Sequence, residues 1–347
     1  MDGRLRDGEV VVGGDARQRY YDSSGYGRPL QGNEIALSRV EAAYLLFKGD
    51  LDEVVREEDG TSMDFREFFA DAGGEITTRF LVYADLRDRG FYLSPDRESW
   101  VGAPRSDSDF VVYPRGKGPW DDAVLYRIRV VGEREDVAAE DLGNVVLAVV
   151  DEESEITYLD TERADVRGSS ESDLPERVPA DLLGERVLAW DPPAELHESA
   201  FYGQLLADRP GENRPRALQL SLVEATHLAA EGRLGVDAET VRARGLEVEG
   251  DRFVRRLRVY RALRERGVVP KTGFKFGADF RTYADVESID DLGHSECLVR
   301  VLPGEHVFEP RDLALDVRLA HGVRKRVVYG LTDGEKVSWL EVSRLTP

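Results

Sequence analysis

The sequence contains a single cysteine, Cys297, among its 347 residues. An internal disulfide needs two cysteines and the cysteine-based zinc and iron–sulfur sites need more, so one chain forms none of them. The sequence also lacks the roughly 20 consecutive apolar residues of a transmembrane helix, and its N-terminal residues lack the apolar segment of a signal peptide. We therefore expect a cytoplasmic protein without a membrane partner.

Lysine is scarce as well. Six of the 47 basic residues are lysine, the acidic residues number 68, and the net charge is −21. An acidic, lysine-poor surface keeps a protein hydrated and dispersed in concentrated salt, where the Debye length falls to about 3 Å at 1 M. This composition predicts a protein from a halophile.

The net negative charge is confined to the first part of the chain. Residues 1–250 carry a net charge of −24, whereas residues 251–347 carry +3. A strongly acidic protein is not expected to bind nucleic acid, because phosphates are negative too. This distribution, however, leaves the C-terminal part of the chain able to face phosphate groups.

Four segments of the first half recur in the second half, in the same order. The offsets between paired segments lie between 170 and 183 residues, about half the chain length. The pairs are 25–27 with 201–203, 37–42 with 220–225, 81–90 with 258–267, and 109–113 with 279–283. Such ordered self-similarity predicts a tandem duplication.

Each copy is predicted to be an α+β unit: a helical or α+β N-terminal part precedes a strand-rich, nuclease-like C-terminal part. In the second copy, apolar spacing predicts helices over 220–234 and 253–266, the first with Ser221 and Glu224 as a capping box. His227 lies on the apolar stripe of that helix and is predicted to be a packed or half-exposed helix residue rather than a ligand. Strands are predicted at 268–271, 278–283, 297–302, 326–331 and 337–342.

The chain is predicted to divide into four domains. The polar stretch 161–175 is the expected joint between the two copies. We expect a first N-terminal subdomain over 1–95, a degenerate catalytic-like subdomain over 96–166, a second N-terminal subdomain over 167–268 and a catalytic subdomain over 269–347.

Three polar residues of the second copy form a candidate catalytic set: Tyr283, His294 and Lys325. The first copy aligns with Tyr113, Ala123 and Asn144 at these positions. Each residue taken alone is typical of packing or of a solvated turn. Together they match RNA cleavage by the neighbouring 2′-hydroxyl, which needs a base, an acid and a cation beside the phosphorane.

The residue types suit these three tasks. Histidine serves as the acid because its ordinary pKa is about 6.5, and lysine supplies the cation. Tyrosine acts as a base only where positive charge lowers its pKa from about 10. Such a site needs neither a metal nor another cofactor.

Several longer strings of the second half carry a family resemblance. They are 220–225 (LSLVEA), 259–267 (VYRALRERG), 271–283 (KTGFKFGADFRTY), 294–296 (HSE) and 318–325 (RLAHGVRK). In these segments the chain resembles the archaeal tRNA-splicing endonucleases, and its first half resembles the degraded repeat of their fused, double-length members. The resemblance implies Tyr283 as general base, His294 as general acid and Lys325 as transition-state stabiliser. It also implies cleavage of precursor tRNA at a bulge–helix–bulge, which leaves 2′,3′-cyclic phosphate and 5′-hydroxyl ends.

The same resemblance implies a homodimer in which an acidic loop of the non-catalytic repeat docks into the partner's catalytic repeat. The matching loop here contains Asp151, Glu152, Glu153 and Glu155. An acidic halophile turn is an equally good interpretation of it. The resemblance further implies that arginines hold a flipped bulge base. Arg318, seven residues before Lys325, fits one of them, and Arg344 is the candidate for the second.

Three alternatives stay open. The first is a non-catalytic structural subunit that binds RNA. The second is a metal-dependent nuclease that uses Asp279 and Glu296. The third is an RNA-binding or RNA-modifying protein that cuts no strand. The metal-dependent mechanism needs paired carboxylates for Mg²⁺, yet the sequence contains no Asp…Glu-x-Lys arrangement. The third alternative lacks support from RNP aromatics, a dinucleotide fingerprint or a P-loop.

Overall fold

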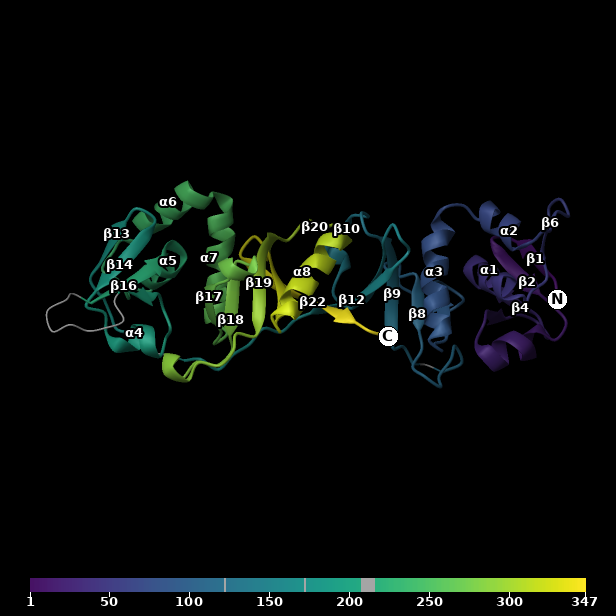
Figure 1. Ribbon diagram of the computed structural model, residues 1–347, viewed down its shortest axis with the longest axis horizontal. Coiled ribbons are helices and arrows are strands. Elements are labelled where there is room, and N and C mark those ends of the chain that lie inside the picture. Colours follow the sequence, from purple (N-terminus) through teal and green to yellow (C-terminus); the bar gives the residue numbers. More distant parts are fainter. Residues whose placement is uncertain (122, 172, 207–215) are drawn as a thin grey trace.

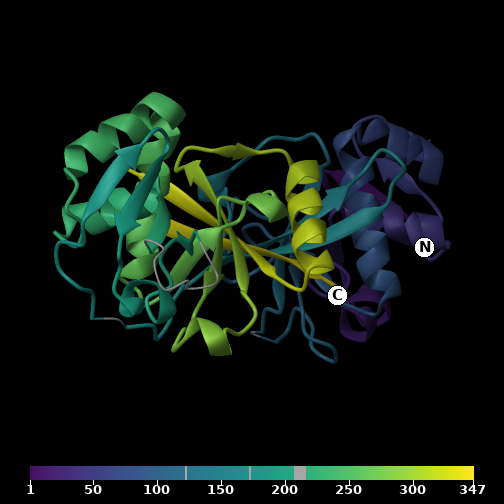
Figure 2. The ribbon, with the colours of Figure 1, turned by 60° about the vertical axis from the view of Figure 1, so that its left-hand side comes forward.

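The computed structural model describes residues 1–121, 123–171, 173–206 and 216–347. The molecule is elongated, with a central ten-stranded sheet and a smaller sheet toward each end (Figure 1). The N-terminus lies at one end, whereas the C-terminus lies near the middle (Figures 1 and 2). None of the helices within these ranges has the length and apolar character needed to cross a membrane.

The first terminal unit combines a six-stranded sheet with three helices. Ser38 caps the first helix, and its hydroxyl accepts the N–H of Glu41 while the Glu41 carboxylate accepts the N–H of Ser38. In sheet order the strands are β3 (Arg28–Pro29), β4 (Ile35–Leu37), β2 (Glu9–Val12), β1 (Gly3–Arg6), β5 (Val54–Arg56) and β6 (Ser62–Met63). The helices are α1 (Arg39–Lys48), α2 (Phe65–Asp71) and α3 (Glu75–Asp88).

The second terminal unit combines a four-stranded sheet with four helices. The predicted capping box of Ser221 and Glu224 is confirmed, but the helix that it caps is shorter than predicted. Leu220 pairs with Val187 in the sheet, so the helix begins only after the cap. In sheet order the strands are β13 (Ala180–Leu183), β14 (Arg186–Trp190), β16 (Ala217–Ser221) and β15 (Gln204–Leu205). The helices are α4 (Ala194–Glu198), α5 (Leu222–Ala230), α6 (Ala238–Glu249) and α7 (Asp251–Arg264).

The central sheet takes five strands from each half of the chain. Its two halves meet where β12 and β22 pair antiparallel, with Thr161 opposite Val342. In sheet order the strands of the second half are β17 (Val269–Thr272), β18 (Phe280–Tyr283), β19 (Cys297–Pro303), β21 (Arg326–Asp333) and β22 (Lys336–Leu345). The first half continues with β12 (Ile156–Arg163), β11 (Val145–Val150), β9 (Tyr126–Gly132), β8 (Phe110–Val112) and β7 (Leu93–Pro95). All five strands predicted for the second half are confirmed, to within about two residues at most ends.

Two predicted boundaries need correction. Because β7 belongs to the central sheet, the first terminal unit ends before Leu93 rather than at residue 95. Because β12 continues through Arg163, the first residues of the expected joint 161–175 lie in a strand. Hydrogen bonding to β22 holds them there, despite their polar side chains.

Equivalent contacts recur in the two halves. Asp109 forms an ion pair with Arg79 at 2.7 Å, and Asp279 forms one with Arg256 at 3.2 Å. In the same way, the buried carboxylate of Glu41 accepts the N–H of Gly27 at 2.8 Å, as that of Glu224 accepts the N–H of Gly203 at 3.0 Å. These paired positions are 170 to 183 residues apart, as in the sequence repeats.

The two halves differ in the connection that leads into β21 in the second half and into the equivalent strand β11 in the first half. In the second half, β20 (Val307–Phe308) and the helix α8 (Pro310–Gly322) join β19 to β21. In the first half, β10 (Val137–Ala138) and a single 3₁₀ turn (Ala139–Asp141) join β9 to β11. The pattern of strands missed α8, which covers the opposite face of the sheet from α7.

Candidate active site

The predicted catalytic residues lie at the ends of three neighbouring strands of the central sheet, all on the same side of the sheet. Strand β18 runs antiparallel to β19, which runs parallel to β21, and Thr282, Cys297 and Arg326 form one row across them. Tyr283, at the end of β18, and Lys325, just before β21, lie one residue beyond this row, on the same side. Since adjacent strands are about 4.8 Å apart, the backbones of β18 and β21 are separated by about 10 Å.

The aromatic ring of Tyr283 is buried, and its hydroxyl has no hydrogen-bond partner among the residues that the structure describes. The ring packs against Val269 and Val286 and meets the ring of Phe201 at 5.6 Å between centroids and 65° between planes. The guanidinium of Arg281 lies 5.8 Å from the centre of the tyrosine ring. Packing therefore fixes the ring, whereas the hydroxyl is left available.

Lys325 holds the segment that carries His294. Its ammonium donates to the carbonyl oxygen of Ser295 at 2.5 Å, and Ser295 directly follows His294. The imidazole of His294 is exposed and has no partner in the described ranges. Because an ammonium has three donors, Lys325 retains two for another ligand. The structure thus brings the three predicted residues to one edge of the sheet.

The segment that joins the two halves packs against the residues that follow Tyr283. The N–H of Ser169 donates to the carbonyl of Ala284 at 2.7 Å. A Cβ atom at Gly168 would lie 2.4 Å from the carbonyl oxygens of Ala284 and Gly267, so that position requires glycine. The joint is therefore a hydrogen-bonded part of the site rather than a free linker.

The corresponding edge of the first half is chemically different. Tyr113 occupies the position of Tyr283, but its hydroxyl lies 3.1 Å from the hydroxyl of Ser94. Strands β9 and β19 begin at equivalent residues, which places Ala123 opposite His294, as predicted. The first half therefore has an engaged tyrosine and no imidazole.

The position opposite Lys325 needs correction by one residue. The equivalent register pairs are Arg129 with Leu147 and Arg300 with Tyr329. This register aligns Lys325 with Gly143 rather than with the predicted Asn144. The alignment through Val150 and Leu331 was wrong because it did not use the pairing with the neighbouring strand.

The two arginines predicted to stack on a base line one cavity. Arg318 lies on α8 and Arg344 on β22, and the cavity between them has a volume of about 440 Å³. Both side chains are exposed, and neither has an ion-pair partner in the part of the chain that is described. Asp151 and Glu155 line the same cavity, so within one chain the acidic loop lies beside these arginines.

The acidic loop is a tight turn between β11 and β12, as predicted. The carboxylate of Asp151 accepts the N–H groups of Glu153 and Glu155, both at 2.9 Å, and this closes the turn. Glu152 forms an ion pair with Arg134 at 3.0 Å. The loop is therefore ordered by hydrogen bonds from its own backbone to the Asp151 side chain, and its remaining carboxylates are exposed.

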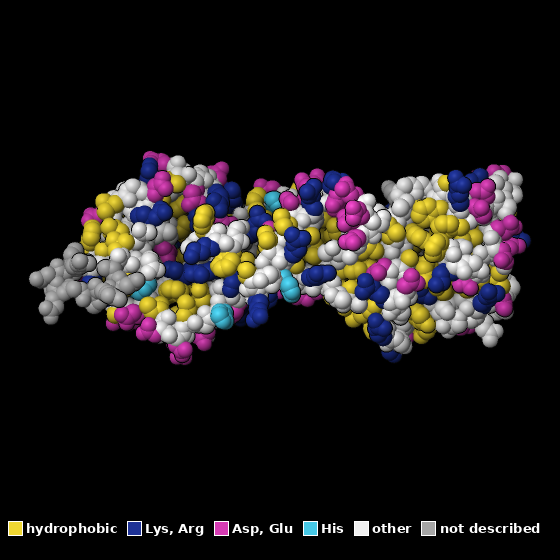
Figure 3. Space-filling model, viewed as in Figure 1, with side chains coloured by type: hydrophobic (Ala, Val, Ile, Leu, Met, Phe, Trp, Pro, Cys, Tyr) yellow, Lys and Arg dark blue, Asp and Glu magenta, His cyan; other side chains and the backbone are white. Residues whose placement is uncertain are grey.

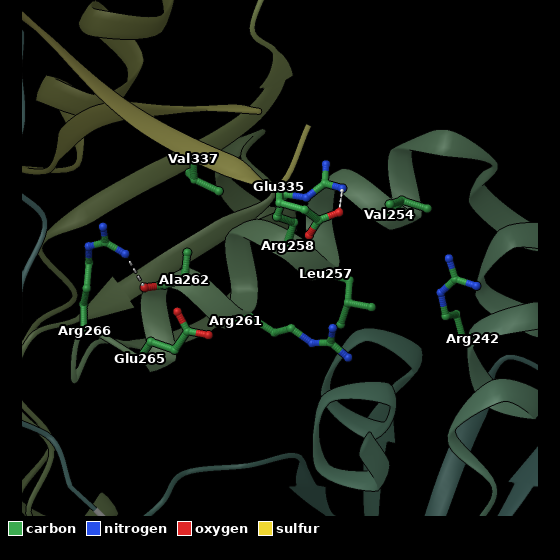
Figure 4. A pocket seen from close by; sticks show the side chains of 10 residues that line it. All are labelled: Arg242, Val254, Leu257, Arg258, Arg261, Ala262, Glu265, Arg266, Glu335 and Val337. Carbon is green, nitrogen blue, oxygen red and sulfur yellow. Dashed lines mark hydrogen bonds and ion pairs between the residues drawn. The ribbon is translucent and has the colours of Figure 1, made fainter. Parts of the chain in front are cut away.

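Basic side chains gather along the middle of one face, over β17, β18 and α8 (Figure 3). A separate arginine-lined pocket lies between α6, α7 and the turn before β22 (Figure 4). There Arg258 reaches Glu335 at 2.9 Å, and Arg266 donates to the carbonyl of Ala262 at 3.1 Å. None of the predicted catalytic residues lines this pocket, so it is not part of the candidate site.

The carboxylates considered for a metal-dependent nuclease have other partners. Asp279 forms ion pairs with Arg252 and Arg256, and it accepts the N–H of Val301 at 2.8 Å. Glu296 directly precedes β19, and its side chain is exposed. Within the described ranges, no three His, Cys, Asp or Glu side chains are grouped so that they could hold a metal ion.

Comparison with known proteins identifies the family. The model of the tRNA intron endonuclease catalytic C-terminal domain matches residues 253–339, which contain Tyr283, His294 and Lys325. The model of the tRNA intron endonuclease N-terminal domain matches twice, at residues 1–69 and 178–245. The chain belongs to the tRNA intron endonuclease family. Its mixed α and β architecture contains both the N-terminal and the catalytic domain of that family.

Full-length relatives support the same assignment. The chain is 60% identical over 347 residues to a tRNA-splicing endonuclease of Haloarcula marismortui, with 98% of each chain covered. It is 59% identical to that of Natronomonas pharaonis, with both chains covered completely. A more distant relative, the tRNA-splicing endonuclease of Methanosarcina acetivorans, is 36% identical over 99% of each chain. The first two come from halophilic archaea, in agreement with the composition.

Two neighbours of the site were not predicted from the sequence. Ser295 supplies the carbonyl that holds Lys325, and Arg281 lies over the ring of Tyr283. The sequence contained a signal for Arg281, because residues two apart on a strand, such as Arg281 and Tyr283, point to the same face. It contained none for Ser295, since a backbone carbonyl is present at every position.

Proposed function

We propose that this chain is a tRNA-splicing endonuclease that excises introns from precursor tRNA at bulge–helix–bulge motifs. The observation that carries the proposal is the position of Tyr283, Lys325 and the segment with His294 at one edge of three adjacent strands. The full-length match to tRNA-splicing endonucleases supports it. A non-catalytic role is not favoured, because the second half has all three reactive groups.

Each group has one task in the reaction. Tyr283, as the base, takes the proton of the 2′-hydroxyl, whose oxygen then attacks the adjacent phosphorus. Lys325 donates to the phosphorane oxygens as negative charge builds up on them. The bond from phosphorus to the 5′-oxygen breaks, and His294 delivers a proton to that oxygen. The products are a 2′,3′-cyclic phosphate and a 5′-hydroxyl, and no metal or cofactor takes part.

The two halves have different roles in this proposal. We infer a tandem duplication, which the recurring contacts and the double match of the N-terminal domain support. Four subdomains follow, with boundaries near residues 92, 166 and 268, and the last of them is catalytic. The first half lacks the imidazole and the ammonium, so it serves as a structural partner.

A homodimer is the proposed assembly, in the cytoplasm of a halophile. In it, the acidic loop docks beside the catalytic repeat of the partner through Asp151, Glu152, Glu153 and Glu155. Arg318 and Arg344, which are exposed and unpaired in the described chain, stack on a base flipped out of the bulge. Measuring the mass of the protein in solution, with and without charge reversal in this loop, tests the assembly.

Cleavage of a minimal bulge–helix–bulge RNA tests the activity. The wild-type protein and His294→Ala are incubated with the RNA in EDTA, and binding is measured in parallel. The proposal expects cleavage by the wild type and none by the variant, with nearly equal affinity for the RNA. An unchanged cleavage rate in His294→Ala would refute the role of the imidazole.

A further inference from the structure

A buried lysine joins the second terminal unit to the edge strand of the catalytic subdomain. The Lys271 ammonium donates to the carbonyl oxygens of Phe201 at 3.1 Å and Gly203 at 3.0 Å, and to the Glu224 carboxylate at 3.1 Å. All three donors of the ammonium are therefore used. The Lys271 side chain is 11% exposed and the Glu224 side chain is 10% exposed.

The carboxylate partner is itself held in place. Glu224 accepts the N–H groups of Gly203 and Ser221, both at 3.0 Å. Burial alone would raise the pKa of Glu224, but Lys271 and these N–H groups outweigh burial and lower the pKa to about 2. The carboxylate is therefore ionised at neutral pH, and the ion pair fixes the segment 201–203 against β17.

This contact reaches the proposed base through one aromatic ring. The Phe201 ring lies 4.7 Å from the Lys271 ammonium on one side and 5.6 Å from the Tyr283 ring on another. The backbone of Phe201 has φ of +52°, a left-handed conformation that a side chain other than glycine adopts only where its surroundings hold it. One of the two carbonyls bound by Lys271 belongs to Phe201 itself, and the other belongs to Gly203, two residues further along the chain.

The first half lacks both members of this contact. Strand pairing aligns Ser94 with Lys271, and the sequence repeat aligns Gly25 with Phe201. Glu41 still accepts the N–H of Gly27, but it has no lysine partner among the residues that the structure describes. In that half the tyrosine hydroxyl is bonded to Ser94. The lysine and the phenylalanine thus occur together, in the half that has an unengaged tyrosine hydroxyl.

We propose that Lys271 and Phe201 are positioning residues for catalysis: they hold the phenol of Tyr283 with its hydroxyl directed toward the reacting 2′-hydroxyl. The inference rests on the proposed function, since it assigns a task to groups behind the proposed base. The edge-to-face ring contact restricts rotation of the phenol. In the second half, Lys271 occupies the position that Ser94 has in the first half. The serine hydroxyl that binds the tyrosine in the first half is therefore missing beside Tyr283.

The first test removes the ring without straining the backbone. Phe201→Gly suits the left-handed φ, so the fold is retained. We expect the single-turnover cleavage rate to fall by about 10-fold, because a misplaced reacting group costs that much or more, while affinity for the bulge–helix–bulge RNA stays unchanged. Phe201→Tyr keeps an aromatic ring and should restore most of the rate. Phe47→Ala, which truncates a 59% exposed ring in the first half, is the matched control and should cleave normally.

The second test installs the arrangement of the first half. Lys271→Ser should fold, because Glu41 shows that the capping carboxylate needs no lysine. We expect a similar loss of rate with unchanged affinity in this variant. Thermal unfolding of each variant separates lost stability from lost rate.

Failure of the inference is distinguishable from failure of the proposed function. If Tyr283→Phe cleaves at the wild-type rate, the role of the tyrosine is wrong and the proposed mechanism falls with it. If Tyr283→Phe is inactive but Phe201→Gly and Lys271→Ser cleave at the wild-type rate, only the positioning inference is overturned. A change in unfolding temperature without a change in rate would have the same meaning.

Discussion

The ammonium of Lys325 donates to the carbonyl oxygen of Ser295, the residue next to His294. This bond links the start of β21 to the start of β19, two parallel neighbours. It therefore ties the proposed cation to the backbone next to the proposed acid. Two consequences follow for a change at Lys325, since the cation is removed and the histidine segment is released.

Lys325→Met should lower the cleavage rate by roughly 10²–10³-fold, the usual cost of removing one transition-state donor. Binding of the bulge–helix–bulge RNA should change far less, because the lysine acts on the phosphorane rather than on the ground state. Lys336→Met, at the exposed first residue of β22 in the same subdomain, is the control. Equal rates for the two variants would contradict the role of Lys325.

The two equivalent tyrosines should respond differently to loss of the hydroxyl. Tyr283→Phe keeps the ring packing but removes the base, so cleavage should fall by roughly 10²–10⁴-fold with little loss of stability. Tyr113→Phe leaves Ser94 without its partner, which should cost about 1 kcal/mol of unfolding free energy and leave cleavage intact. Single-turnover cleavage and urea unfolding of both variants check this pair. Loss of activity in Tyr113→Phe alone would reverse the assignment of the halves.

Much of the second half could be predicted from local sequence. Ser221 and Glu224 lie three residues apart, and this spacing is enough to define the cap of a helix. The strands were predictable because each is a short apolar run between turns. The catalytic candidates could be found by comparing the two similar copies, because both have the tyrosine but only the second has the histidine and the lysine.

The rest depends on contacts that local patterns do not encode. Helix α8 has Leu313, Val317 and Ala320 on one buried face, a helical spacing, but the comparison of halves concealed it because the first half has only a 3₁₀ turn there. Lys271 was visible in a family string, yet its partners Phe201 and Glu224 are 70 and 47 residues away in the sequence. Only the fold brings them together.

The buried His227 should make stability depend on pH. Its ring lies between the rings of Tyr202 and Tyr260, as a packed residue rather than a ligand. Burial, with Arg264 and Arg261 nearby, lowers the pKa of His227 from 6.5 to about 3, so the ring is neutral although Glu231 lies 3.6 Å away. The unfolded chain then binds a proton that the folded chain does not.

Titration of His227 therefore does not reduce the free energy of unfolding above about pH 6.5, but it lowers that free energy progressively as the pH falls toward 3. The loss across this window should be on the order of 4 kcal/mol. His227→Phe keeps an aromatic ring and should flatten the dependence between these pH values. Urea unfolding at several pH values, with the exposed His321→Phe as control, measures the difference. Equal slopes for the wild type and His227→Phe would show that the histidine is protonated in the fold.

Cleavage should persist in concentrated salt. Counterion release contributes little to RNA binding in molar salt, so recognition must rest on shape and on stacking. The exposed arginines Arg318 and Arg344 are suited to stacking because a guanidinium binds a base face as well as a phosphate. Cleavage rates from 0.1 to about 3 M KCl test this expectation. Loss of activity above about 0.5 M salt would count against it.

The chemistry of the cut ends tests the central claim most directly. A minimal bulge–helix–bulge RNA is incubated with the wild-type protein in EDTA, and the products are identified by mass spectrometry. Attack by the 2′-hydroxyl, with Tyr283, His294 and Lys325 as the reacting groups, predicts 2′,3′-cyclic phosphate and 5′-hydroxyl ends. Products with a 3′-hydroxyl and a 5′-phosphate would contradict it.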